Sequence, residues 1–219
     1  MIEITNEDCM DLMARYPDKH FDLCIVDPPY GIGLEMKTYG SKNAKRGDYE
    51  VKGWNDNIPL PEYFNELHRV SKNQIIWGCN FYGANIKGPG RIVWDKKGRN
   101  GVFSQCDIAY QSFNRLNYMF EYAWHGFIQQ DMGHKETRIH PTQKPVALYK
   151  WLLKNYAKPG DKILDTHLGS GSIAIACHDA GYDLTACEID KDYYEAAMKR
   201  LRQHQAQFNL FEKVKSIND

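Results

Sequence analysis

Residues 162–188 carry the pattern that most limits how this chain can fold. An apolar segment, Lys162–Asp165, precedes a glycine-containing loop at 169–172, an apolar stretch that stops at Gly181, and a second apolar segment at 183–187. Short apolar runs next to glycines are typical of buried strands, and glycine is favoured just after a helix. The pattern predicts a strand, a tight loop, a helix and a second parallel strand, which together form a βαβ unit.

Apolar segments elsewhere extend this unit into a larger sheet. We expect further strands at 2–4, 21–26, 75–77 and 91–94. We expect helices at about 6–16, 61–70, 145–156 and 190–208, the first capped by Asn6 and the last by Asp190. Two aromatic-rich segments within 107–125, joined by 114–117, predict a hairpin. The expected fold is one α/β domain over 1–219, with a doubly wound, mostly parallel sheet and an antiparallel edge hairpin.

Composition excludes several classes of protein. No apolar run approaches the roughly 18 residues of a membrane helix, and we expect neither a signal peptide nor membrane binding. The six cysteines are scattered and form no Cys-x-x-Cys pair, which fits a reducing cytoplasm and excludes a structural zinc. His125, His134 and His140 match no zinc spacing, so we expect no metal.

The glycine loop and the acidic residues around it indicate a nucleotide-type cofactor. Glycines let the backbone approach a ligand closely, and Glu188 lies where a carboxylate can accept hydrogen bonds from ribose hydroxyls. Gly169, Gly171 and Ala174 also match a dinucleotide pattern, so NAD is an alternative. Asp165 favours S-adenosylmethionine over NAD, because a carboxylate repels the pyrophosphate of NAD but suits the cationic amino group of S-adenosylmethionine.

A second motif, Asp27-Pro28-Pro29-Tyr30, follows an apolar strand segment. It can be a rigid turn, since aspartate and proline form turns. It also suits methylation of an exocyclic amine: the Asp27 carboxylate and the Pro28 carbonyl can each accept one N–H, which frees the nitrogen lone pair for attack. Tyr30 offers an aromatic face to a flipped-out base. Methylation at cytosine C5 is excluded, because the chain has no Pro-Cys pair.

Three motifs in order give the chain a family resemblance. They are the tetrapeptide at 27–30, His-Pro-Thr-Gln-Lys-Pro at 140–145, and Leu-Asp-Thr-His-Leu-Gly-Ser-Gly-Ser at 164–172. The chain resembles the β-class amino-methyltransferases of bacteria and phages, which act on adenine N6 or cytosine N4. The resemblance covers about 1–205 and implies a circularly permuted, Rossmann-like methyltransferase fold, in which the catalytic motif precedes the cofactor motif.

The resemblance also implies roles for individual residues. Catalysis falls to Asp27, Pro28, Pro29 and Tyr30. The implied cofactor-binding residues are Asp8, Cys9, Asp27, Thr142, Lys144, Asp165, Thr166, Leu168, Gly169, Ser170, Gly171, Ser172, Glu188 and Ile189. Leu168 stands where the family usually has phenylalanine, and Ser172 where it often has threonine, so we expect weaker cofactor packing. The Gly78–Tyr82 segment resembles a family stretch near the catalytic pocket; a strand-ending turn is an equal alternative.

DNA binding is less clearly encoded. The formal net charge is zero, which gives a nucleic-acid function no support. Loops are expected at 31–57 and 126–139, and we expect them to be mobile and to contact DNA. The candidate DNA-binding residues are Lys37, Lys42, Lys45, Arg46, Lys96, Lys97, Arg99, Lys135 and Arg138, although charge alone favours solvated loops as the explanation of such clusters. The region 89–138 is short for an independent target-recognition domain, so loops, a partner or a second subunit must supply base contacts.

These observations lead to one principal hypothesis. We expect a site-specific adenine-N6 methyltransferase that acts on double-stranded DNA with S-adenosylmethionine, in a restriction-modification setting and with a homodimer by analogy. Cytosine N4 is an alternative target, and aspartate rather than serine at position 27 favours adenine. RNA or protein-glutamine methylation usually goes with asparagine in place of Asp27. A non-catalytic DNA-binding subunit is the alternative of another class, and the intact Asp27 and Tyr30 argue against it.

Overall fold

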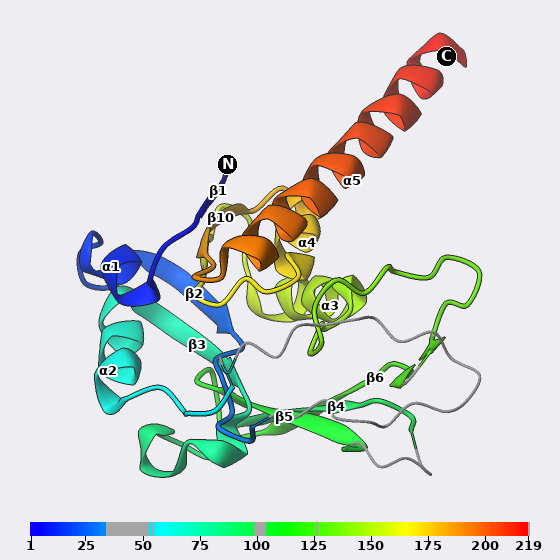
Figure 1. Ribbon diagram of the computed structural model, residues 1–219. Helices are drawn as coiled ribbons and strands as arrows, with labels where there is room; N and C mark the ends of the chain where they lie inside the picture. The colour runs from blue at the N-terminus through cyan, green and yellow to red at the C-terminus, as the bar shows by residue number, and fades with distance from the viewer. Residues whose placement is uncertain (34–52, 54, 99–103, 126, 219) are drawn as a thin grey trace.

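A central sheet organises the computed structural model, which describes residues 1–33, 53, 55–98, 104–125 and 127–218 (Figure 1). The strand order is β1-β10-β9-β2-β3-β5-β4-β6. These strands are β1 (Ile2–Thr5), β2 (Phe21–Val26), β3 (Ser71–Trp77), β4 (Arg91–Asp95), β5 (Cys106–Gln111), β6 (Asn117–Glu121), β9 (Lys162–Asp165) and β10 (Asp183–Cys187). The helices are α1 (Cys9–Ala14), α2 (Pro61–Val70), α3 (Val146–Tyr156), α4 (Ser172–Ala180) and α5 (Lys191–Asn218).

Helices cover both faces of the sheet, which explains why β2 is apolar without interruption from Leu23 to Val26. Leu23 and Ile25 point into the core beneath α3, α4 and α5, whereas Cys24 and Val26 point into the core beneath α1 and α2. Side chains alternate between the faces of a strand, so a strand covered on both sides needs a continuous apolar run. The predicted doubly wound, mostly parallel α/β fold is therefore confirmed.

The antiparallel part of the sheet differs in detail from the prediction. β5 runs antiparallel to both of its neighbours, β3 and β4, whereas β6 pairs in parallel with β4. The expected antiparallel hairpin is present, but β4 and β5 form it; the two segments predicted to pair within 107–125 do not, because β4 lies between them. Burial gives the reason: Ile92 and Trp94 place β4 in the core, where it needs a partner on each side. The Gln111 side chain bonds the Asn114 and Leu116 carbonyls in the connection that passes β4.

Two helix predictions need correction. Asp8, not Asn6, caps α1, because its carboxylate accepts the Met10 amide at 2.7 Å. Asn6 instead donates its side-chain amide to the Glu188 and Ile189 carbonyls. The last helix continues to Asn218, ten residues beyond the predicted end at 208. Its predicted cap is confirmed, since Asp190 accepts the amides of Asp192 and Tyr193 at 3.0 and 3.1 Å.

The two sequence motifs meet at one edge of the sheet. β2 and β9 are parallel neighbours, with Cys24 opposite Leu164, so Asp27, which follows β2, and Asp165, the last residue of β9, lie at the same edge of the sheet. From β2 the chain continues through α2 to β3 on one side, and from β9 through α4 to β10 on the other. Such a switch of direction creates a crevice at the carboxyl ends of the strands, where doubly wound sheets bind ligands. No helix in the described part of the chain is long and apolar enough to cross a membrane.

Candidate active site

A cavity of about 260 Å³ opens at the carboxyl ends of β2 and β9. Its wall consists of the segment after β2, the segment before α3, the glycine loop after β9 and the segment after β10, together with Tyr149 of α3 and Tyr193 of α5. The predicted site residues among its lining are Asp27, Pro29, Thr142, Lys144, Leu168, Gly169, Ser170, Glu188 and Ile189. The fold thus brings the tetrapeptide and the glycine loop to a single cavity, although more than 130 residues separate Tyr30 from Gly169 along the chain.

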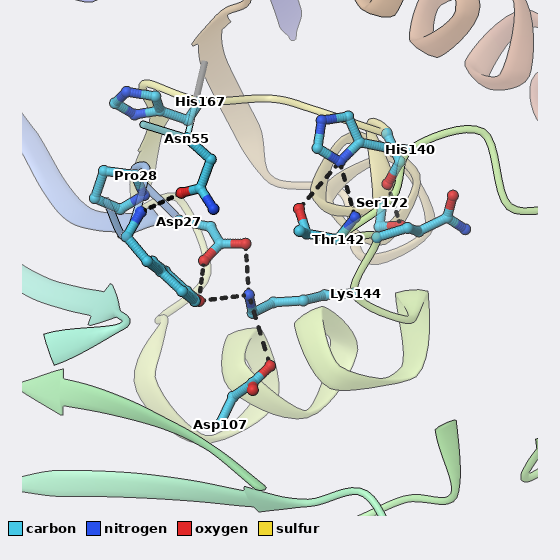
Figure 2. A network of polar contacts seen from close by, with 12 residues as sticks. Asp27, Pro28, Asn55, Asp107, His140, Thr142, Lys144, His167 and Ser172 are labelled. Atoms are coloured by element: carbon cyan, nitrogen blue, oxygen red, sulfur yellow. Dashed lines mark hydrogen bonds and ion pairs between the residues drawn. The ribbon is translucent and has the colours of Figure 1, made fainter. Parts of the chain in front are cut away.

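Side chains hold the Asp27 carboxylate on both of its oxygens (Figure 2). The Tyr30 hydroxyl donates to Oδ1 at 2.6 Å, and the Lys144 ammonium donates to Oδ2 at 2.5 Å. The same ammonium lies 3.1 Å from the Tyr30 hydroxyl. Burial, together with the nearby Asp27 charge, raises the pKa of Tyr30 well above its usual value, so this hydroxyl keeps its proton and remains a donor. Lys144 was expected to bind the cofactor; here it binds the catalytic motif.

Backbone geometry next to β3 fixes the Tyr30 ring. Gly78 has a left-handed conformation with φ of 73°, and a Cβ atom there would lie 2.2 Å from the ring. Glycine is therefore needed both for the turn and for space. The ring stacks on Phe81 at 5.0 Å between centroids, and the Tyr30 amide donates to Asn55 Oδ1 at 2.6 Å. One face of Tyr30 is thus covered, and stacking on a base remains a prediction for the other face.

The Pro28 carbonyl also has a partner. The Tyr82 hydroxyl donates to it at 2.7 Å, and Tyr82 is buried. A carbonyl oxygen has two lone pairs, so one remains for a substrate N–H. Tyr82 and Gly78 belong to the 78–82 segment, which the resemblance places near the catalytic pocket. The segment is both a strand-ending turn and part of the pocket surroundings, because Gly78 packs against the Tyr30 ring and Tyr82 bonds the Pro28 carbonyl.

The glycine loop does two separate jobs. Gly169 lines the cavity, and its amide donates to Glu188 Oε2 at 2.8 Å. Gly171 instead lies against α5, where an added Cβ would approach Ala197 Cβ to 3.2 Å, so its lack of a side chain serves helix packing. Glu188 Oε1 also accepts the Asp190 amide at 3.0 Å. Burial raises the pKa of Glu188.

Several predicted cofactor residues lie just behind the cavity lining. Asp165 is 1% exposed and accepts the His167 amide at 3.0 Å, and its burial raises its pKa to about 8. Thr166 bonds the buried Tyr63 hydroxyl at 2.7 Å, and Ser172 bonds Ser170. Asp8 and Cys9 belong to the start of α1 and are not part of the lining. A cofactor role for these five residues remains a prediction.

Sequence reasoning missed two histidines of the cavity wall. His140 and His167 both line the cavity, and burial lowers the pKa of each to about 4. Both imidazoles are therefore neutral near pH 7. His140 Nδ1 accepts the Thr142 amide at 3.3 Å, and its ring lies edge-on to Tyr193 at 4.3 Å. Their places inside the 140–145 and 164–172 motifs were the available signal.

The predicted DNA-binding residues are spread over the chain. Lys37, Lys42, Lys45, Arg46 and Arg99 lie outside the described residues. Lys96 and Lys97 are ion-paired with Asp107 and Glu121 respectively. Lys135 is exposed and lies 5.9 Å from the Phe127 ring, and Arg138 lies 4.5 Å from the Trp124 ring. These contacts do not place Lys96, Lys97, Lys135 and Arg138 on one shared surface.

Residues 127–139 are more ordered than an unstructured loop. β7 (Trp124–His125) and β8 (Ile128–Gln129) form a small antiparallel pair. The Gln129 side chain exchanges two hydrogen bonds of 2.8 Å with the Glu136 backbone. The Glu136 carboxylate in turn accepts from Arg200 of α5 at 2.6 Å. These contacts tie the base of the segment to the body of the protein.

One polar cluster lies between the helices, away from the cavity. Asp179 Oδ1 lies 2.5 Å from His204 Nε2 and 3.3 Å from His178 Nδ1, and these donor atoms are close enough to share a metal ion. Asp179 Oδ2 is bound by Lys150 at 2.6 Å. Because protein donors already satisfy this carboxylate, we interpret the cluster as an ion-pair network joining α3, α4 and α5. The sequence predictions considered only loop histidines and therefore did not identify this cluster.

Comparisons with known proteins agree with the motifs. A family model described as DNA methylase, of the N6 and N4 type, matches residues 117–199. A methylase named YubD from Escherichia coli K12 is 26% identical over 210 residues, covering 89% of this chain and 87% of its own. The type II methyltransferase M.BglII from Bacillus subtilis is 25% identical, covering 98% of this chain and 73% of its own.

Solved structures agree with the fold. A complex of M1.HpyAVI with SAM has a TM-score of 0.57 at 21% identity and covers 92% of this chain and all of that one. The cytosine-N4-specific PvuII DNA methyltransferase has a TM-score of 0.60 at 9% identity, covering 95% of this chain and 91% of that one. At such identities the likeness shows the fold. The family model, the two relatives and the three ordered motifs together support a member of the DNA amino-methyltransferase family.

Proposed function

We propose that this protein transfers a methyl group from S-adenosylmethionine to the N6 amine of an adenine flipped out of double-stranded DNA. The observation that carries the proposal is the shared cavity, which Asp27 lines together with Gly169 and Glu188. An amine acceptor and a nucleotide-type loop thus face the same space. Family membership and the M1.HpyAVI complex with SAM support the choice of reaction and cofactor.

The residues around the cavity suit this cofactor. Glu188 lies where a ribose can meet a carboxylate, and Ile189, 65% exposed, offers an apolar surface at the rim to an adenine ring. Buried Asp165 supplies a carboxylate near the loop, with an orientation fixed by the His167 amide. The site needs no cation to bind a phosphate, because S-adenosylmethionine carries no phosphate. When bound, S-adenosylmethionine supplies an electrophilic methyl group on a sulfonium.

The chain's own task is to make the target amine nucleophilic. Asp27 and the Pro28 carbonyl each accept a hydrogen bond from one of its two N–H groups. Together these hydrogen bonds favour a tetrahedral nitrogen, whose lone pair is no longer conjugated with the ring. Tyr82 fixes the Pro28 carbonyl, and the Gly78 turn fixes Tyr30, so both acceptors are preorganised. This chemistry needs no covalent enzyme intermediate and no general base with a perturbed pKa.

The choice of adenine rests on Asp27 itself, since a carboxylate at this position favours adenine within the resembling family. Cytosine N4 is the second candidate, because the fold is shared with a cytosine-N4-specific enzyme. A tritiated-methyl assay on DNA, RNA and protein, followed by nucleoside analysis, decides the matter. We expect N6-methyladenine from double-stranded DNA. N4-methylcytosine selects the second candidate, and unlabelled DNA despite intact cofactor binding overturns both.

DNA contacts are proposed for the segments 31–57 and 126–139. Most of the first lies outside the described residues, and the second carries exposed Lys135. Limited proteolysis tests this proposal: we expect DNA to protect residues 35–55 from cleavage, and unchanged cleavage with saturating DNA contradicts it. Sedimentation with and without DNA tests the expected homodimer.

A further inference from the structure

Charged side chains alternate from the Asp27 carboxylate towards the protein surface. Lys144 Nζ lies 2.5 Å from Asp27 Oδ2 and 4.0 Å from Asp107 Oδ2, and Asp107 Oδ1 lies 2.6 Å from Lys96 Nζ. We call these four residues the ion-pair chain; Figure 2 shows its three inner members. The Lys144 side chain is 3% exposed, and the Lys96 and Asp107 side chains are 19% and 17% exposed. Asp27, at the cavity end, is 16% exposed, so the ion-pair chain joins the cavity to a partly open outer end through the buried Lys144.

Lys144 presents a conflict at the catalytic carboxylate. In the proposed function Asp27 accepts an N–H from the target amine, yet Lys144 already donates an N–H to Oδ2 and Tyr30 donates to Oδ1. An ammonium group is a stronger donor than a base amine, because its hydrogen bond is charge-assisted. Each carboxylate oxygen keeps a second lone pair, but the Lys144 charge compensates Oδ2 and weakens it as an acceptor, so the target amine binds more strongly once Lys144 loosens its hold on Asp27. A buried ammonium cannot simply be left without a counter-charge, so it needs a second acceptor.

Asp107 is placed to be that acceptor. It lies on β5, and its Oδ2 faces Lys144 at 4.0 Å, beyond hydrogen-bond distance but within reach of a small side-chain movement. We propose that Lys144 is a positioning residue that holds Asp27 in the resting protein and shifts to Asp107 when the target amine arrives. This inference rests on the proposed function.

Lys96 controls how strongly Asp107 attracts Lys144. It neutralises Asp107 from the outer side, directly after β4 and beside Lys97, in a segment whose basic residues we expect to meet DNA. When a DNA phosphate draws Lys96 away, Asp107 regains its full charge and pulls Lys144 from Asp27. The ion-pair chain thereby links arrival of the substrate to exposure of the amine acceptor.

Two substitutions give effects of opposite sign. Asp107→Asn removes the second acceptor, so Lys144 stays on Asp27, and we expect single-turnover methyl transfer to slow by at least about tenfold. Lys96→Met removes the outer neutralising charge. Because Lys96 is also a candidate DNA-binding residue, we expect this variant to bind DNA more weakly but to transfer the methyl group faster than the wild type at saturating DNA and cofactor. Lys72→Met is the matched control, because Lys72 forms an exposed ion pair with Asp22 at 2.6 Å away from the cavity. A merely structural role predicts losses for both test variants.

A stability experiment tests the ion-pair chain without any activity. The coupling between Lys144→Met and Asp27→Asn is measured in a double-mutant cycle by urea unfolding, first in the wild-type background and then with Lys96→Met. We expect a smaller coupling in the second background, since Asp107 then draws Lys144 away from Asp27. Circular dichroism confirms that every variant folds.

The outcomes separate the two proposals. Rates that change in the same direction in Asp107→Asn and Lys96→Met, or do not change, overturn the shift of Lys144. An unaltered coupling in the Lys96→Met background overturns it independently. If the wild type labels no DNA, the proposed function fails, and the stability cycle still decides whether the ion-pair chain exists.

Discussion

The catalytic carboxylate and the cofactor-side carboxylates are held by different kinds of donor. Asp27 is bound by the side chains of Tyr30 and Lys144, which can change partners. Asp165 and Glu188 are bound by backbone amides of the loops after β9 and β10. Backbone donors in a short loop cannot move without unfolding it. We infer that the cofactor side is preformed and that adjustment to the substrate is concentrated around Asp27.

The largest expected effect tests that separation directly. Asp27→Asn keeps the shape of the side chain but removes the charge that accepts the amine hydrogen, so transfer should fall by about a thousandfold or more. Cofactor affinity, measured by calorimetry, should change by less than about threefold, because backbone amides hold the carboxylates of Asp165 and Glu188 on the cofactor side. A comparable loss of cofactor affinity contradicts the division into two independently held parts.

The second-largest expected effect is a pH dependence of cofactor affinity that arises from Asp165. Its pKa is raised to about 8 by burial, so the carboxyl is protonated in the free protein near neutral pH. A cationic amino group needs the carboxylate, and binding must then release a proton. Cofactor affinity should rise with pH towards about 8, by up to about tenfold per unit, and Asp165→Asn should flatten the profile. Calorimetry in buffers of different ionisation enthalpy measures the released proton; no release contradicts the assignment.

The same pKa has a consequence for folding. Because the folded-state pKa of Asp165 lies above its ordinary value of 3.8, its contribution to stability is fully present below that value. The contribution is lost as pH rises towards about 8. The melting temperature of the cofactor-free wild type, relative to Asp165→Asn, should therefore fall between pH 4 and 8. A constant difference across this range means that the shift is absent.

A pair of glycines tests how firmly Tyr30 is set. Gly78→Ala places a Cβ 2.2 Å from the Tyr30 ring, whereas Gly83 has a similarly positive φ, 52°, and nothing within 4 Å. Both substitutions carry the left-handed strain of about 1–2 kcal/mol in unfolding free energy. Only Gly78→Ala should also slow methyl transfer, by about tenfold or more, as Tyr30 is displaced from Asp27. Equal rates in the two variants mean that the Tyr30 position does not matter.

The smallest effect concerns Asp8, which caps α1 at 2.7 Å. Asp8→Ala should cost about 1 kcal/mol of unfolding free energy, whereas Asp8→Asn retains a good cap. We expect both substitutions to weaken cofactor binding by only a few fold, in line with a contact outside the cavity lining. Identical affinities in the wild type and both variants remove Asp8 from the cofactor site.

Sequence signals were sufficient for much of the local structure, although the predicted Asn6 cap was wrong because Asn6 binds the distant Glu188 and Ile189 carbonyls. The βαβ unit at 162–188, the Gly181 stop and the Asp190 cap depend on neighbouring residues, and all three are confirmed. The two segments within 107–125 do not pair with each other, because β4, which is distant from β6 in the sequence, pairs with both β5 and β6. No local pattern encodes that pairing.

The cavity itself was only partly predictable. Motif order placed Asp27 and Gly169 in one site, but the partner of Asp27 is Lys144, 117 residues away. The roles of Gly171 and His140 also depended on what packs against them, namely Ala197 and Tyr193. Such contacts follow from the tertiary arrangement, which residue type alone does not specify.

The adjacency of β2 and β9 has a consequence for how the protein is made. The two strands lie next to each other in the sheet, yet β9 is synthesised long after β2, and the Lys144 contact to Asp27 closes a loop of similar size. Contacts between residues so distant in the chain form slowly, because the entropy of closing the loop must be lost first. A nascent chain that ends before β9 already contains the whole tetrapeptide but has no cavity beside it. The ability to modify DNA should therefore arise late in synthesis, and a truncated chain should be inert rather than indiscriminate.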